Sequence, residues 1–150
     1  MVNTVTNYMS RIRERLLQVV SSGQEPVDRI LLQPLQRPGK LVRPQLVLLS
    51  SSLFGEINDL AIDVAVAIEC IHTASLVHDD IVDGASLRRG IPTINHLFDS
   101  SAAVLAGDHL FATAFELLAH HRLNDILSEV TRTIKQMCAG EITQDLNLFN

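Results

Sequence analysis

The sequence predicts an all-α fold. Apolar residues recur at spacings of three and four over most of the 150 residues, whereas no run alternates with a convincing period of two. Prolines and glycines typical of turns, and Asn and Asp residues typical of helix caps, separate these periodic segments. Because no repeat, low-complexity tract or linker interrupts the pattern, residues 1–150 are expected to form a single all-α unit.

The first part of the chain is expected to hold three helices. An amphipathic helix is predicted over residues 5–20, because its apolar side chains follow the three-and-four spacing. A short helix is predicted over residues 26–33, since a proline suits its first turn and the next proline ends it. Residues 38–44 form a turn bounded by prolines, and it leads into a helix over residues 44–55.

The rest of the chain is expected to hold three longer helices. Asn58 is a suitable cap for a helix that reaches about residue 82, and residues 84–92 form a loop. The next helix spans residues 100–120, is capped by the Asp-Ser pair at its start, and has a His-His pair at its end that we expect to contact the terminal carbonyls. The last helix begins near residue 124 and continues almost to the C-terminus.

The composition excludes several classes of protein. With 47% hydrophobic and 19% charged residues, the chain is not intrinsically disordered. With one Tyr, no Trp, and 12 basic against 17 acidic residues, it has little with which to bind nucleic acid. Neither a signal-peptide pattern nor an uncharged apolar run of membrane-spanning length is found, so we expect no transmembrane segment and a cytoplasmic location. Cys70 and Cys138 both lie in apolar helical patterns and are expected to be buried thiols.

Acidic residues mark the end of the long helix that follows Asn58. At 100° per residue, Asp79 and Asp83 lie one turn apart on one face, and His72 falls within about 20° of the same stripe. Stacked carboxylates repel each other unless a hard cation bridges them, and oxygen ligands favour Mg²⁺ or Mn²⁺ over zinc. The set therefore indicates a metal site with a phosphorylated ligand, or else a solvated acidic helix end that includes Asp80.

Two basic pairs complement these acids. Arg88 and Arg89 follow the acidic residues closely and offer fork-shaped donors to phosphate oxygens. Lys40 and Arg43 stand at a turn that enters a helix, where they can hold a second anion or form a solvated basic turn. The charge is unevenly distributed, since residues 1–45 carry 7 basic and 3 acidic side chains and the remainder carries 5 and 14.

Five short motifs occur in a fixed order and together resemble one protein family. They are Gly-Lys-Leu-Val-Arg-Pro at 39–44, Glu-x-x-His-x-x-Ser-Leu-x-His-Asp-Asp-x-x-Asp at 69–83, Arg-Arg-Gly at 88–90, Ala-Gly-Asp-His-Leu-Phe at 106–111 and Gly-Glu-x-x-Gln at 140–144. The set resembles the trans-isoprenyl diphosphate synthases, in particular the medium- and long-chain polyprenyl diphosphate synthases. The resemblance implies an antiparallel helical bundle of the isoprenoid synthase type, of which this chain matches the N-terminal half.

The resemblance also implies a role for each matching residue. It implies that Asp79 and Asp83 are ligands of Mg²⁺ and that Asp80 supports them. Arg88 and Gln144 are implied for the allylic diphosphate. The residues implied for isopentenyl diphosphate are Lys40, Arg43, His72 and Arg89. In such enzymes, the residues four and five positions before the first aspartate gate product length; here they are Ser75 and Ala74, both small, which favours a longer polyprenyl product.

The resemblance leaves part of an active site unaccounted for. Members of the family carry a second aspartate-rich motif in a C-terminal half, and no second Asp-Asp-x-x-Asp occurs in this chain. The chain is therefore expected to be a subunit whose site a partner chain completes, or a fragment of a longer synthase. The alternative is a non-catalytic interaction subunit that packs against a catalytic partner and shapes its product. A ferritin-like di-iron protein is disfavoured, because Glu69-Cys-Ile-His72 has no second Glu-x-x-His to match it.

Overall fold

The computed structural model describes residues 2–37 and 39–148 and confirms the all-α fold. Helices form wherever the apolar residues follow the helical period, and only one short hairpin interrupts them in the described part of the chain. In chain order the elements are α1 (Val2–Val20), α2 (Glu25–Leu31), the 3₁₀ turn η1 (Gln33–Leu35), α3 (Val42–Ser52), α4 (Asp59–Val82), β1 (Leu87–Arg88), β2 (Ile91–Pro92), α5 (Ile94–Leu97), α6 (Ser100–His120) and α7 (Asn124–Leu148).

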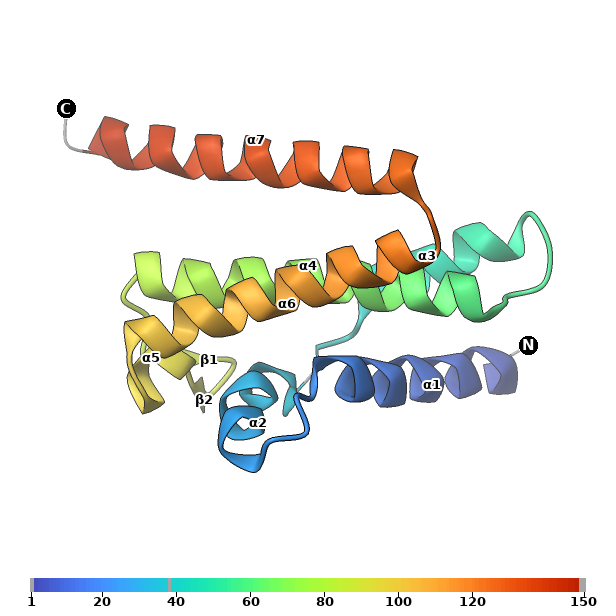
Figure 1. The fold of residues 1–150 in the computed structure, drawn as a ribbon, viewed down its shortest axis with the longest axis horizontal. Helices are drawn as coiled ribbons and strands as arrows, with labels where there is room; N and C mark the ends of the chain where they lie inside the picture. Colours follow the sequence, from blue (N-terminus) through green and yellow to red (C-terminus); the bar gives the residue numbers. More distant parts are fainter. Residues whose placement is uncertain (1, 38, 149–150) are drawn as a thin grey trace.

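Two long helices, α4 and α6, form the centre of the bundle. They run antiparallel and make the most extensive contact between any two elements (Figure 1). Both helices carry fully buried alanines, namely Ala65, Ala67 and Ala74 in α4 and Ala103 and Ala114 in α6. Helix α1 packs along one side, and α7 returns along the other side, where it contacts α6 near its own start.

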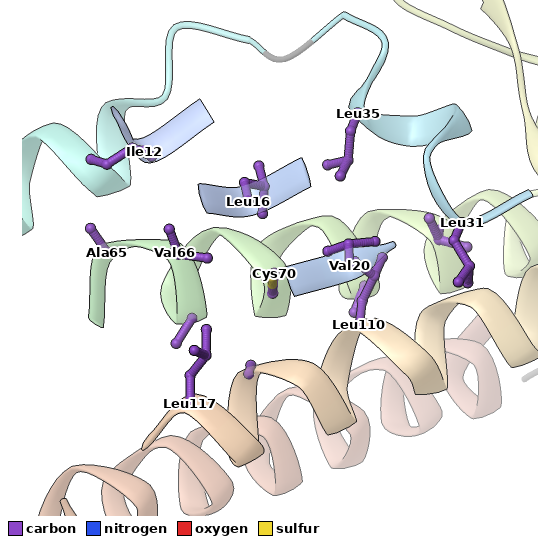
Figure 2. Packing of buried hydrophobic residues seen from close by; sticks show 14 of the residues in the cluster. Ile12, Leu16, Val20, Leu31, Leu35, Ala65, Val66, Cys70, Leu110 and Leu117 are labelled. Atoms are coloured by element: carbon purple, nitrogen blue, oxygen red, sulfur yellow. The ribbon is translucent and has the colours of Figure 1, made fainter. Parts of the chain in front are cut away.

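The hydrophobic core lies between α1, α4 and α6. Ile12, Leu16 and Val20 project from one face of α1 towards Val66 and Cys70 of α4 (Figure 2). Leu110 and Leu117 reach the same cluster from α6, and Leu31 and Leu35 close it at the end where the functional residues gather. Full burial of each such aliphatic side chain contributes about 2 kcal/mol to folding, so this cluster holds the long helices at a fixed spacing.

Most helix boundaries agree with the sequence prediction. The Asn58 side chain accepts a hydrogen bond from the Ala61 amide at 3.0 Å, and Asp99 accepts one from Ala102 at 2.7 Å, so both act as N-caps. Helix α3 begins at Val42, two residues before the expected proline start. The predicted loop over residues 84–92 instead contains the hairpin β1–β2.

Two further expectations concern membrane-spanning segments and the cysteines. By length and composition alone, α4 and α6 are long and apolar enough to cross a membrane, although in this structure both are packed helices at the centre of the bundle. Cys70 is buried as expected, and burial raises the pKa of its thiol to about 12. Cys138 is exposed, because it lies on the part of α7 that extends beyond the contact with α6.

A buried ionic cluster ties three helices together at the end of the bundle away from the hairpin. Asp63 of α4 accepts a hydrogen bond from Nε of Arg15 at 2.8 Å and pairs with Nε2 of His121 at 2.7 Å. His121 thus contacts a carboxylate on another helix. The sequence predicts contact with the terminal carbonyls of its own helix, and that prediction is wrong for this residue. The two partners hold the pKa of Asp63 below its usual range, although burial alone would raise it.

Candidate functional site

A surface pocket brings together four side chains that lie far apart in the sequence. Lys40, Arg43, His72 and Arg89 line it together with Glu69, and we call this set of five the basic pocket. The first four are the residues for which the resemblance implies binding of isopentenyl diphosphate. Their placement around one opening gives a site with three permanent cations, which suits a multiply charged anion such as a diphosphate.

The turn before α3 and the first turn of that helix present Lys40 and Arg43, respectively. Between them, Leu41 adopts a left-handed backbone conformation (φ 50°) and buries its side chain, leaving 3% of the residue exposed. That conformation is unfavourable for a residue with a side chain, and burial of Leu41 offsets its cost. The carbonyl of Lys40 also accepts a hydrogen bond from the Gln45 side chain at 2.6 Å. The two cations are therefore held at the mouth of the pocket by a fixed turn.

The β-hairpin presents Arg89. Leu87 pairs with Pro92 and Arg88 with Ile91, so residues 89 and 90 form a two-residue loop. Arg89 and the following glycine both have positive φ, 52° and 76°, as a type I′ turn requires. The guanidinium of Arg89 then lies so close to Gly39 that a Cβ at that position would clash with its Nη1 atom. Position 39 therefore requires glycine for Arg89 to occupy this place.

Burial and charge shape the titration of the pocket. Burial lowers the pKa of His72, and the positive charges of Arg43 and Arg89 lower it further. A neutral imidazole is thus favoured near pH 7, and it can donate one hydrogen bond to an anion. Burial raises the pKa of Glu69, while the same two guanidinium groups oppose the rise. Glu69 is 8% exposed, so the pocket contains one largely buried carboxyl among its cations.

The acidic end of α4 lies at the same end of the bundle. Asp79 and Asp83 are one turn apart, as the Asp83 amide donates to the Asp79 carbonyl at 2.8 Å. Burial raises the pKa of Asp79, and repulsion from Asp83 and Asp80 adds to the rise while Arg88 opposes it. Within the described residues neither the Asp79 nor the Asp83 carboxylate has a hydrogen-bond or ion-pair partner. Two unpaired carboxylates at this spacing fit the oxygen-donor preference of Mg²⁺.

The donor set for such a metal is incomplete in the part of the chain that the structure describes. No group of three or more His, Cys, Asp or Glu side chains there could hold a metal ion by itself. Mg²⁺ is commonly held by one or two carboxylates, with phosphate oxygens and water as its other ligands. Asp79 and Asp83 therefore fit a metal that arrives with a diphosphate or is shared with another chain.

Asp80 is turned away from this pair and holds Arg88. It is 5% exposed and accepts a hydrogen bond from Nε of Arg88 at 2.7 Å. Because the bond uses Nε, the guanidinium keeps its two terminal amino groups for a phosphate, as the resemblance implies. Asn95 donates to the backbone carbonyls of Asp80 and Ala85, at 3.3 and 3.1 Å, which fixes the loop between α4 and the hairpin.

A second pocket connects the two charged regions. It shares Glu69, His72 and Arg89 with the basic pocket, and it also reaches the paired Asp80 and Arg88. The rest of its lining is largely apolar, with Leu35, Leu76, Val77, Ile91 and Ile94 among its members. The structure thus places a continuous cleft between the residues implied for one diphosphate and the arginine implied for the other.

Asp79 and Asp83 line neither pocket, although Asp80 lines the second. Three further predicted residues also lie outside both pockets. Gln144 is exposed on α7 and lies outside both. Ala74 is fully buried in the core between α4 and α6. Ser75 is half-buried, and its hydroxyl donates to the His72 carbonyl at 2.9 Å. The roles assigned to these three stay predictions.

Two residues of the site were not singled out by sequence reasoning. Gly39 entered only as part of a motif, and its contact with Arg89 depends on chain segments 50 residues apart. Glu69 entered only as the first residue of another motif. A usable signal existed for Glu69, because an acidic residue one turn before His72 on an otherwise apolar helix must either pair with a cation or reach a cavity.

Comparisons with known proteins agree with the motif analysis. A sequence model described as polyprenyl synthetase matches residues 24–149. Component 2 of heptaprenyl diphosphate synthase from Geobacillus stearothermophilus is 39% identical over 148 residues, which cover 96% of this chain and 45% of that protein. The solanesyl diphosphate synthase 2 of Arabidopsis thaliana chloroplasts is 35% identical, covering 97% of this chain and 36% of its own length.

Solved structures show the same relation. The heptaprenyl diphosphate synthase of Staphylococcus aureus superposes with a TM-score of 0.86 at 35% identity, over 93% of this chain and 45% of that one. An isoprenoid synthase family member from Thermotoga neapolitana gives a TM-score of 0.81 at 34% identity, over 89% and 54%. The predicted isoprenoid synthase fold is confirmed, and the chain spans about half the length of these relatives or less.

Proposed function

This chain belongs to the polyprenyl synthetase family, and from that premise we propose that it is a subunit of a prenyltransferase. In this proposal it condenses isopentenyl diphosphate with an allylic diphosphate and yields a medium- or long-chain polyprenyl diphosphate. The observation that carries the proposal is the basic pocket, in which Lys40, Arg43, His72 and Arg89 line one opening.

The residues of the two pockets suggest how the substrates are held. The basic pocket binds the diphosphate of isopentenyl diphosphate, with Arg43 and Arg89 as fork-shaped donors and neutral His72 as a single donor. Arg88, kept in place by Asp80, offers its terminal amino groups to the allylic diphosphate. Mg²⁺ bound by Asp79 and Asp83 would supply Lewis-acid stabilisation of the departing diphosphate.

Condensation then joins the two substrates. The carbon–oxygen bond of the allylic diphosphate breaks, the double bond of isopentenyl diphosphate attacks the allylic cation, and loss of a proton restores a double bond. The role of this chain is to bind both diphosphates at a set separation and to contribute apolar walls that exclude water from the cation. The small side chains of Ala74 and Ser75 favour a longer product.

A partner chain is part of the proposal. The sequence has a single aspartate-rich motif, and the chain corresponds to about half of its relatives' length. One relative is named as component 2 of a heptaprenyl diphosphate synthase, a name that supports an enzyme built from more than one chain. We therefore propose that another chain supplies a second aspartate-rich motif and completes the site. A cytoplasmic location stays a prediction.

A second candidate is a non-catalytic subunit that packs against a catalytic one and shapes its product. The observation that favours it is the exposure of large apolar side chains on α7, where Met137, Ile142 and Leu146 are 47%, 61% and 62% exposed. In that case the pockets described above would not take part in turnover. The two candidates differ in whether Asp79 and Arg43 are needed for activity.

Co-purification followed by a radiolabelled condensation assay separates the candidates. We expect no elongation by the 150-residue chain alone, and elongation once Mg²⁺ and a chain with the second motif are added. Asp79→Asn should then abolish turnover, while Glu116→Gln, which neutralises an exposed acid on α6, should not change it. Activity of the purified chain alone would contradict the need for a partner. Unchanged turnover of Asp79→Asn in an active complex would favour the non-catalytic subunit.

A further inference from the structure

Glu69 occupies an unexpected place for an acidic residue. It lies on α4 one turn before His72, is 8% exposed, and lines both the basic pocket and the cleft that joins it to Arg88. A pocket that binds an anion gains nothing in affinity from a carboxylate in its wall, because like charges repel strongly where water is scarce. The position of Glu69 therefore calls for an explanation other than attraction of the ligand.

The neighbours of Glu69 define its electrostatic role. Arg43 belongs to the first turn of α3 and Arg89 to the hairpin, and both positive charges stabilise the ionised carboxyl against the effect of burial. Lys40 adds a third cation at the mouth of the pocket. With Glu69 ionised and His72 neutral, one of the three positive charges is cancelled from within the wall.

We propose that Glu69 limits the affinity of the basic pocket for a diphosphate. This inference rests on the proposed function and extends it. Only the allylic substrate loses its diphosphate in the condensation, so the lengthened product still carries the diphosphate that entered with isopentenyl diphosphate. That product must leave the basic pocket before a further isopentenyl diphosphate can enter. A carboxylate that lowers the affinity for the diphosphate speeds release of the product, which suits a synthase that repeats this cycle.

Calorimetric binding to the 150-residue chain tests the proposal without requiring turnover. Inorganic pyrophosphate and isopentenyl diphosphate are titrated at low salt without metal and at pH 8, which is well above the ordinary pKa values of a glutamate and a histidine. We expect Glu69→Gln to bind both ligands about tenfold more tightly than the unsubstituted chain, because one negative charge is removed near the anion. The gain should shrink as salt is raised, since screening weakens the charge–charge interaction.

Further variants keep the test decisive. Glu69→Met removes the charge with a side chain of similar volume, so the result does not depend on the folding of the Gln variant alone. Glu69→Asp keeps the charge and should retain the original affinity. Glu116→Gln removes an equal charge from the exposed face of α6 and should leave binding unchanged within about twofold.

The outcomes distinguish this inference from the proposed function. If neither the unsubstituted chain nor its complex with the partner chain binds either ligand, the basic pocket is not a diphosphate site, and the proposed function fails together with the inference. If the unsubstituted chain binds but the neutral variants bind equally or more weakly, the inference alone is overturned. In the active complex, Glu69→Gln should lower both KM for isopentenyl diphosphate and kcat, because release of the product becomes slower.

Discussion

Two ion pairs between α1 and α4 differ in burial and in the number of partners of the aspartate, and their comparison gives a direct prediction about stability. Arg11 pairs with Asp59 at 2.7 Å and Arg15 with Asp63 at 2.8 Å, one turn further along both helices. The Asp59 side chain is 89% exposed, whereas that of Asp63 is 11% exposed and also contacts His121 at 2.7 Å. The substitutions Asp59→Asn and Asp63→Asn therefore remove the same charge from two different environments.

The expected magnitudes follow from this difference. Removing one partner of a buried ion pair commonly costs about 3–5 kcal/mol, because the other partner is left uncompensated. The Arg15 side chain is 36% exposed and partly solvated, so we expect a smaller loss for Asp63→Asn, about 2 kcal/mol. For a chain of this length that loss corresponds to a fall in Tm of about 4–8 °C. Asp59→Asn should cost at most about 0.5 kcal/mol.

Urea denaturation followed by circular dichroism measures both losses, and repeating it at several pH values tests their cause. The pKa of Asp63 is held below its ordinary value in the folded state, so its contribution is fully present above the pKa of the unfolded chain. It is lost as the pH falls through the folded pKa. The difference between Asp63→Asn and the unsubstituted chain should therefore shrink below about pH 4. Equal losses for the two variants at pH 7 would refute the argument from burial.

Three other substitutions test the site and the fold. Gly39→Ala should displace the Arg89 guanidinium and weaken pyrophosphate binding about tenfold in calorimetry, while the midpoint of urea denaturation stays nearly unchanged. Asn58→Ala removes the N-cap of α4 and should lower the free energy of unfolding by about 1 kcal/mol in the same denaturation experiment. Leu110→Ala leaves a cavity at a fully buried position and should lower the free energy of unfolding by about 3 kcal/mol, and Tm with it. Leu105→Ala, at a residue 65% exposed on the same helix, should change Tm little.

The helices could be predicted from the sequence because their determinants are local. The caps at Asn58 and Asp99 need only an oxygen three residues before a free amide, and the structure shows both bonds. The hairpin was missed because its strands are two residues long, too short for any alternation to appear. Its turn was nonetheless encoded by Gly90, a residue that readily takes the positive φ found there.

The interactions between helices could not be predicted in the same way. Asp63 lies 48 residues from Arg15 and 58 from His121, so nothing in its neighbourhood distinguishes it from an exposed acid. Cys138 fits a helical apolar pattern, yet it is exposed because burial requires a neighbouring element that the described part of the chain does not place there. The pattern of a helix defines which face is apolar, and only tertiary packing decides whether that face is covered.

The hairpin directs two adjacent arginines to different regions of the structure. Side chains that follow one another along a strand point to opposite faces, and the strand ends at Arg88 while Arg89 already belongs to the turn. Arg88 is consequently directed to Asp80 at the acidic end of α4, and Arg89 to Gly39 at the basic pocket. Gly90 allows the reversal to be completed in two residues, so the separation between the guanidinium groups is fixed by backbone geometry. Lengthening this turn by one residue would alter that separation and should impair the pairing of two diphosphates more than the binding of either one.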